Sequence, residues 1–288
     1  MSSLQDRIGL HSWTLDTTPL AEVLRIAREA GYNAVELRHV DFKRCLEAGM
    51  SNEHVLAMIR ASGITVSCMG LESGTIFARG GEQRRLFDSM DQMCARAAAL
   101  DCEVMMVAPG TNPAGTVKEA ARNFAAGGEI AQKYGLRCAL EFNSRHPVVN
   151  RLAVAREILA LANQPNCGLL IDTYHAQCAG DGGRAFEDVP ASDIIAFQFS
   201  DVPPGPISKT GTALDRLPPG KGVVRWREVL QLLMEKGYDR YINYEAPNPA
   251  QWSRPPEEVA REGIALIKAL LADATAAARA RIADSKSP

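Results

Sequence analysis

Residues 168–175 read GLLIDTYH, a short apolar run that ends on Asp172 and His175. The same arrangement recurs at residues 137–143 (RCALEFN), where the apolar run ends on Glu141. Buried strands are normally apolar, so a carboxylate at the end of such a strand must have its charge matched by a partner. We therefore interpret both runs as buried strands that deliver reactive side chains to one edge of a sheet.

Two further runs repeat the pattern closer to the C-terminus. Residues 241–246 (YINYEA) carry Glu245, and residues 194–201 (IIAFQFSD) carry Gln198. Together the four runs present two glutamates, an aspartate and an amide oxygen at successive strand ends. Such an oxygen-rich set suits one hard divalent cation. A metal-dependent enzyme is the leading hypothesis.

The rest of the chain alternates short apolar runs with stretches whose apolar residues recur near every 3.6 positions. The runs predict strands at residues 8–13, 34–37, 65–69, 104–107, 136–142, 167–171, 194–199 and 241–245. The periodic stretches predict helices at residues 20–30, 52–62, 83–100, 117–134, 153–162, 226–236 and 256–271. Several of these helices end at a glycine just before the next strand, as helices commonly do.

This alternation predicts a single (β/α)8 TIM barrel, whose active site lies at the C-terminal strand ends. The helix of the sixth unit is poorly marked, because residues 180–188 are polar and rich in glycine. An open doubly wound sheet is the alternative fold, but the turn at residues 12–15 (SWTL) lacks the glycine-rich phosphate motif expected there. We expect the barrel to span residues 1–272 and a C-terminal tail to span residues 273–288.

Composition excludes several function classes. The 288 residues are 46% apolar and 23% charged, with a formal net charge of −2, so neither nucleic acid nor an anionic membrane is an expected partner. No apolar run approaches the ~20 residues of a membrane span, and the N-terminus does not resemble a signal peptide. Seven scattered cysteines without any CxxC motif predict buried thiols in a reducing cytoplasm.

Other side chains are expected at the same barrel mouth. His11 follows the first strand and Asn143 continues the polar end of the fifth, so both are candidates for substrate contact. His175 lies three residues after Asp172 and is a candidate acid or base. Arg216 lies in a long loop rich in proline and glycine, where it could hold a substrate oxygen. Glu36 could also face the mouth, but a structural role is favoured for it.

The chain resembles the xylose-isomerase-like barrel superfamily, which holds sugar isomerases and epimerases, hydroxypyruvate isomerase, inosose dehydratase and 3-dehydroshikimate dehydratase. The motifs behind the resemblance are LEFN at Glu141, the DTYH motif that begins at Asp172, FQFSD around Gln198, RLPPGKG from Arg216, and YEAPNP at Glu245. The resemblance implies one divalent metal ion held by Glu141, Asp172, Gln198 and Glu245. Many members have histidine where this chain has Gln198.

The expected reaction is removal of a proton next to a metal-bound carbonyl, through an enediolate, with Glu141 and Glu245 as base and acid. Return of the proton makes an isomerase or epimerase of a small sugar, keto-sugar or polyol-derived ketone. Expulsion of a hydroxyl, with His175 as its acid, makes a dehydratase of the inosose or 3-dehydroshikimate type. A non-catalytic sugar-binding barrel ranks lower.

Oxygen ligation favours Mn²⁺ or Mg²⁺, with Co²⁺ as a substitute. Barrel enzymes of this kind often pair, so a homo-oligomer is also expected.

Overall fold

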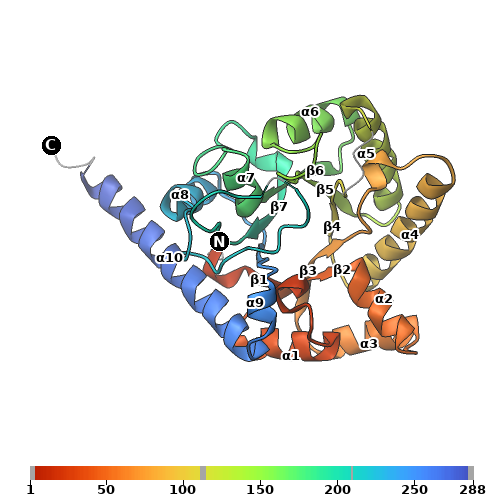
Figure 1. The fold of residues 1–288 in the computed structure, drawn as a ribbon, viewed down its shortest axis with the longest axis horizontal. Helices are drawn as coiled ribbons and strands as arrows, with labels where there is room; N and C mark the ends of the chain where they lie inside the picture. Colours follow the sequence, from red (N-terminus) through yellow and green to blue (C-terminus); the bar gives the residue numbers. More distant parts are fainter. Residues whose placement is uncertain (1–3, 111–114, 209, 285–288) are drawn as a thin grey trace.

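The computed structural model describes residues 4–110, 115–208 and 210–284, and its centre is a closed barrel of parallel strands (Figure 1). Strand order follows the sequence, and the last strand closes the barrel by pairing with the first. The strands are β1 (Ile8–His11), β2 (Ala34–Arg38), β3 (Thr65–Gly70), β4 (Val104–Val107), β5 (Arg137–Glu141), β6 (Cys167–Asp172), β7 (Ile194–Phe199) and β8 (Ile242–Tyr244). The predicted (β/α)8 barrel is therefore confirmed, and the open doubly wound alternative is wrong.

Helices surround the barrel (Figure 1). They are α1 (Leu20–Ala30), α2 (His39–Glu47), α3 (Asn52–Ala61), α4 (Gly80–Ala99), α5 (Val117–Gln132), α6 (Leu152–Ala162), α7 (Thr173–Cys178), α8 (Trp226–Glu235), α9 (Pro249–Trp252) and α10 (Pro256–Asp284). Short 3₁₀ turns occur at Leu4–Asp6, Ser12–Leu15, Thr75–Phe77 and Ala191–Asp193. The helices predicted from periodicity are all present, with ends that differ by a few residues, except that α10 continues well past residue 271.

Three short helices, α2, α7 and α9, do not follow from the periodicity. Both α2 and α7 begin at the residue directly after a strand, so no polar or glycine-rich loop in the sequence marks where they start. Asp172 ends β6 and at the same time caps α7, because its side chain accepts a hydrogen bond from the backbone N–H of Tyr174 at 2.7 Å. The short helix of the sixth unit therefore lies at α7, before residues 180–188.

Alternation along each strand separates an apolar outer face from the bore of the barrel. On β5, the outward Cys138 and Leu140 pack in the main core between strands and helices, whereas Ala139 belongs to a small inner cluster. Side chains two residues apart on a strand share a face. Glu141 therefore points inward above Ala139, and Gln198 points inward above Ala196 on β7.

The C-terminal helix α10 packs against α8 and α1, and its far end extends beyond the barrel (Figure 1). It crosses residue 272 as one continuous helix, and residues 285–288 of the predicted tail lie outside the described residues. The division of the chain at residue 272 remains a prediction. Within the described residues, no helix is long and apolar enough to cross a membrane.

Candidate active site at the strand ends

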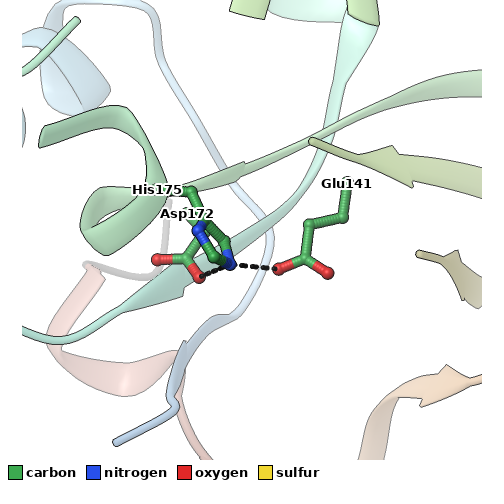
Figure 2. Close-up of side chains that lie close together, drawn as sticks. All are labelled: Glu141, Asp172 and His175. Atoms are coloured by element: carbon green, nitrogen blue, oxygen red, sulfur yellow. Dashed lines mark ion pairs between the residues drawn. The ribbon is translucent and has the colours of Figure 1, made fainter. Parts of the chain in front are cut away.

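Three side chains form a compact polar group at the mouth of the barrel. Glu141 ends β5, Asp172 ends β6, and His175 lies on α7; one potential ligand atom from each lies within 4.8 Å of the others. Figure 2 shows His175 between the two carboxylates, with its Nε2 atom 3.9 Å from Glu141 Oε1 and 3.9 Å from Asp172 Oδ2. All three side chains are buried. The arrangement is suited to hold a metal ion.

Arg216 extends this group toward β8. Its Nη1 atom donates to Asp172 Oδ2 at 2.7 Å and to Glu245 Oε2 at 2.7 Å, and its Nη2 atom lies 3.1 Å from His175 Nε2. Only 2% of Arg216 is exposed, so the loop residue expected to reach for substrate lies deep among the carboxylates. Its Nε atom has no hydrogen-bond partner in the described part of the chain and remains a free donor.

Gln198 on β7 and His11 on β1 face Glu36 of β2 inside the bore. Gln198 Nε2 donates to Glu36 Oε1 at 2.9 Å. His11 Nε2 is 3.4 Å from Glu245 Oε1 and 3.9 Å from Glu36 Oε1, which is too long for a normal hydrogen bond. Glu245 therefore joins the two halves of the site, with one oxygen toward Arg216 and the other toward His11.

The site holds more negative charge than its own cations can match. Four buried carboxyls surround one guanidinium: Glu36, Glu141, Asp172 and Glu245. Full ionisation would leave all but one of these negative charges unmatched. Burial raises the pKa of Glu36 to about 8 and that of Asp172 to about 6, the latter against the lowering effect of Arg216. Burial and the neighbouring Glu245 and Asp172 also raise the pKa of Glu141 well above its usual range.

The donor set therefore fits a divalent cation, which would replace the protons that Glu36 and Glu141 otherwise keep. A second observation agrees with this fit. Gln198 Oε1 and Glu36 Oε2 are buried polar atoms without a hydrogen-bond partner among the described residues. Oxygen atoms left this way inside a protein usually face an ion or a water molecule.

A hydrogen bond shows which nitrogen of His11 carries the proton. His11 Nδ1 accepts from the backbone N–H of Trp13 at 3.0 Å, so its Nε2 carries the proton and is a donor. Both ring nitrogens of His175 face a donor. Its Nδ1 accepts from the backbone N–H of Ser144 at 3.2 Å, and its Nε2 lies 3.1 Å from Arg216 Nη2.

Burial and the nearby arginines keep both imidazoles neutral. Desolvation lowers the pKa of His11 well below 6.5, and Arg38 adds to this effect. Desolvation also lowers the pKa of His175 well below 6.5, with Arg216 as the next cause.

A cavity of about 450 Å³ opens above the site. Four charged or polar groups of the centre line it directly: Glu141, His175, Arg216 and Glu245. His11, Asn143, Trp13 and Arg38 also line this cavity. Asn143 Oδ1 accepts from the backbone N–H of Arg145. The cavity therefore brings together all of the predicted catalytic and substrate-binding residues, while Asp172 and Gln198 lie beneath its surface.

Arg145 holds the loop before Arg216 over the cavity, a role that the sequence did not indicate. Its Nη2 atom donates to Asp215 Oδ1 at 2.8 Å and its Nη1 atom donates to the carbonyl of Thr212 at 2.7 Å. Tyr174 adds a 2.6 Å hydrogen bond from its hydroxyl to Asp215. At the base of the same loop, Asp201 accepts from three backbone N–H groups and from the indole of Trp226.

These pKa shifts predict how the stability of the metal-free protein varies with pH. The pKa of Glu36 is about 8 in the folded protein, against an ordinary glutamate value of 4.5, and the pKa of Glu141 is raised in the same direction. A raised folded pKa contributes stability that is present below the unfolded pKa and is lost as the pH rises through the folded value. The lowered pKa values of His11 and His175 act oppositely, but only below 6.5.

We therefore expect the melting temperature of EDTA-treated protein to fall as the pH rises from about 6.5 to about 8.5. Differential scanning calorimetry measures this decline. The Glu36→Gln variant should show a shallower decline, because the amide does not titrate. A melting temperature that stays constant over this interval would show that the carboxyls are already ionised in the folded state.

Comparison with known proteins agrees with this fold. Residues 24–270 match the family model of the xylose isomerase-like TIM barrel. An inosose isomerase of Halalkalibacterium halodurans is 25% identical over 257 residues, which cover 85% of this chain and 89% of that protein. A crystal structure of the IOLI protein with a zinc atom has a TM-score of 0.82 at 21% identity, covering 93% of this chain and 98% of that chain. An L-ribulose 3-epimerase has a TM-score of 0.78 at 18% identity, covering 98% and 99%.

Proposed function

We propose that this chain, which belongs to the xylose isomerase-like TIM barrel family, is a divalent-metal-dependent isomerase or epimerase of a small sugar, keto-sugar or polyol-derived ketone. The observation that carries the proposal is the pair of buried carboxylates, Glu141 and Glu245, that face one cavity from β5 and from the end of β8. The similarity to an inosose isomerase supports the reaction class.

In this proposal Glu141, Asp172, Gln198 and Glu245 hold the metal ion, with His175 beside it. Oxygen donors favour Mn²⁺ or Mg²⁺, with Co²⁺ as a substitute; the zinc atom of the IOLI protein shows which metal a similar barrel can carry. When bound, the cation supplies Lewis-acid polarisation of the substrate carbonyl, which acidifies the neighbouring C–H bond.

Proton transfer belongs to the two glutamates. One of them removes the proton from the carbon next to the carbonyl, and the other returns a proton to the same or the adjacent carbon. Return to the same carbon from the opposite side gives an epimer, and return to the adjacent carbon gives an aldose–ketose isomer. The raised pKa of Glu141 suits a group that must both take up and release a proton near neutral pH.

The remaining residues orient the substrate. His11 Nε2–H and Arg216 Nε–H are unpartnered donors within the described residues, and both side chains line the cavity, so they can bind substrate oxygens. His175 lies at the wall of the same cavity. Asn143 lies at the cavity wall as a further polar contact. The loop held by Arg145 limits the access of water to the reacting carbon.

The dehydratase alternative requires His175 to act as a proton donor. Loss of hydroxide requires an acid that delivers a proton to the departing oxygen. His175 is neutral, its pKa is lowered, and its Nε2 atom faces the Arg216 guanidinium. This arrangement favours the isomerase or epimerase reaction over dehydration.

Proton NMR in D₂O tests the proposal. Protein loaded with Mn²⁺ is incubated with a panel of ketoses, inososes, hydroxypyruvate and 3-dehydroshikimate, and the metal is removed by chelation before the spectra are recorded. The expected result is deuterium on a carbon next to the carbonyl, with every hydroxyl retained. A new vinyl or enone signal would instead establish a dehydratase, and no exchange with any compound would contradict the proposed reaction.

A further inference from the structure

The amide of Gln198 is held in one orientation, and that orientation determines what it can bind. The oxygen and nitrogen ends of a glutamine amide are nearly the same size, so the group can sit either way round. Asp172 and Gln198 are register partners on neighbouring strands. Beside the carboxylate of Asp172 the NH₂ end of Gln198 would be preferred electrostatically, but an NH₂ group cannot ligate a cation. A second acceptor elsewhere in the bore must therefore hold the NH₂ end away from Asp172.

Glu36 makes that contact from across the bore. Gln198 Nε2 donates to Glu36 Oε1 at 2.9 Å, although β2 and β7 are not neighbours in the barrel. Both residues are completely buried, and neither lines the cavity. The other end of the amide, Gln198 Oε1, is the end left without a partner among the described residues.

Asn243 and Cys68 lie next to Glu36 in the bore. Burial raises the pKa of Glu36 most, and these two side chains lower it. Asn243 accepts a hydrogen bond from the hydroxyl of Ser67 at 2.8 Å. It fits into the bore because Gly9 has no side chain, since a Cβ atom there would overlap the Asn243 amide oxygen. Complete burial among these neighbours leaves the Glu36 carboxyl little room to move.

We propose that Glu36 is a positioning residue, which captures the NH₂ end of Gln198 and thereby presents the Gln198 oxygen to the metal ion. This inference rests on the proposed function, because it assumes that Gln198 is a metal ligand. It assigns a task to a residue that does not line the cavity. It also explains how the Gln198 amide can be a metal ligand, although only its oxygen end can bind a cation.

The test measures Mn²⁺ affinity by isothermal titration calorimetry on the full-length, metal-stripped protein. Glu36→Met removes the acceptor at similar volume, and it should weaken Mn²⁺ binding by about 10- to 100-fold, the usual effect of losing a partner of a metal ligand. Glu36→Gln keeps an acceptor oxygen, and its dissociation constant should lie closer to wild type than to E36M on a logarithmic scale. Gln198→Met should weaken binding to the same degree as E36M.

The double variant separates positioning from charge. If Glu36 acts through Gln198, adding E36M to Gln198→Met should cause no further loss of affinity. An equal further loss in the double variant would show that Glu36 acts by its charge, and it would overturn the inference. Full Mn²⁺ affinity in E36M would do the same. Failure of the wild-type protein to bind Mn²⁺ would instead reject the proposed function, and with it this inference.

Melting curves of the metal-free variants provide the structural control. E36M leaves the buried NH₂ group of Gln198 without its acceptor, which lowers stability. It also removes a buried carboxyl, which is costly to bury, so E36M should melt close to wild type. Glu36→Leu serves as a second apolar variant if E36M folds poorly. A loss of Mn²⁺ affinity that merely followed a lower melting temperature in both variants would count against a positioning role.

Discussion

Glu245→Gln is expected to lower kcat by about 10²- to 10⁴-fold, the range that general acid–base catalysis contributes. The amide has nearly the same shape as the carboxyl, but it cannot remove or return a proton. Glu141→Gln should have an effect of the same size, because in the proposed reaction each glutamate performs one of the two transfers. Steady-state kinetics on the substrate identified by deuterium exchange measures both effects.

Glu119→Gln is a matched control for these variants. Glu119 is also a buried carboxylate, held by Arg79, but it lies on α5 outside the cavity. Its replacement should leave kcat unchanged. Activity that survives in both E141Q and E245Q would rule out the two-glutamate mechanism.

Arg216→Met is expected to destabilise the metal-free protein by about 3–5 kcal/mol at pH 8, the usual cost of removing one partner of a buried ion pair. Arg216 bonds Asp172 and Glu245 at 2.7 Å each, and both carboxylates are buried. Without the guanidinium they stay buried with no cationic partner. Urea unfolding in EDTA measures the change, and added Mn²⁺ should restore much of the lost stability.

Arg79→Met is the control for this experiment. Arg79 also pairs with a glutamate, but its side chain is 64% exposed. An exposed pair contributes about 0–1 kcal/mol, so its loss should change the unfolding free energy little. If R216M unfolds at the same urea concentration as wild type in EDTA, the cluster does not depend on Arg216 for charge balance.

The strand-end residues could be predicted because two simple rules place them. Successive parallel strands are neighbours in a barrel, and inward positions recur every second residue. Glu141, Asp172, Gln198 and Glu245 satisfy both rules, so their meeting at one mouth needs only the strand assignments. His175 follows from Asp172, because the chain turns directly into α7.

The depth of Arg216 and the contact between Glu36 and Gln198 could not be predicted in this way. Nothing in the loop sequence indicates which cation turns inward, since that depends on the charge of carboxylates far away in the chain. Glu36 and Gln198 lie on strands that are not neighbours. Their contact therefore depends on how far the strands are shifted along one another in the closed barrel, which the strand assignments do not give. Arg145 was missed for a similar reason, because its partners belong to a loop some 70 residues later.

The proposed active site also accounts for its unusual number of buried charges. A stable barrel has no need of four carboxyls around one arginine, and burial makes each ionised carboxyl costly. Proteins accept such costs at functional sites, where a ligand supplies the missing charge. The pKa values of Glu36, Glu141 and Asp172 are raised because these carboxyls are buried with too little positive charge nearby.

Metal content is the most direct test of this account. Wild-type protein and Asp172→Asn are dialysed against Mn²⁺, passed through a desalting column at pH 8, and analysed by inductively coupled plasma mass spectrometry. We predict one divalent ion per wild-type chain and a substoichiometric amount in D172N, with both proteins equally folded by circular dichroism. Wild-type protein that retains no metal, or D172N that retains as much as wild type, would contradict the claim that this cluster is a metal centre.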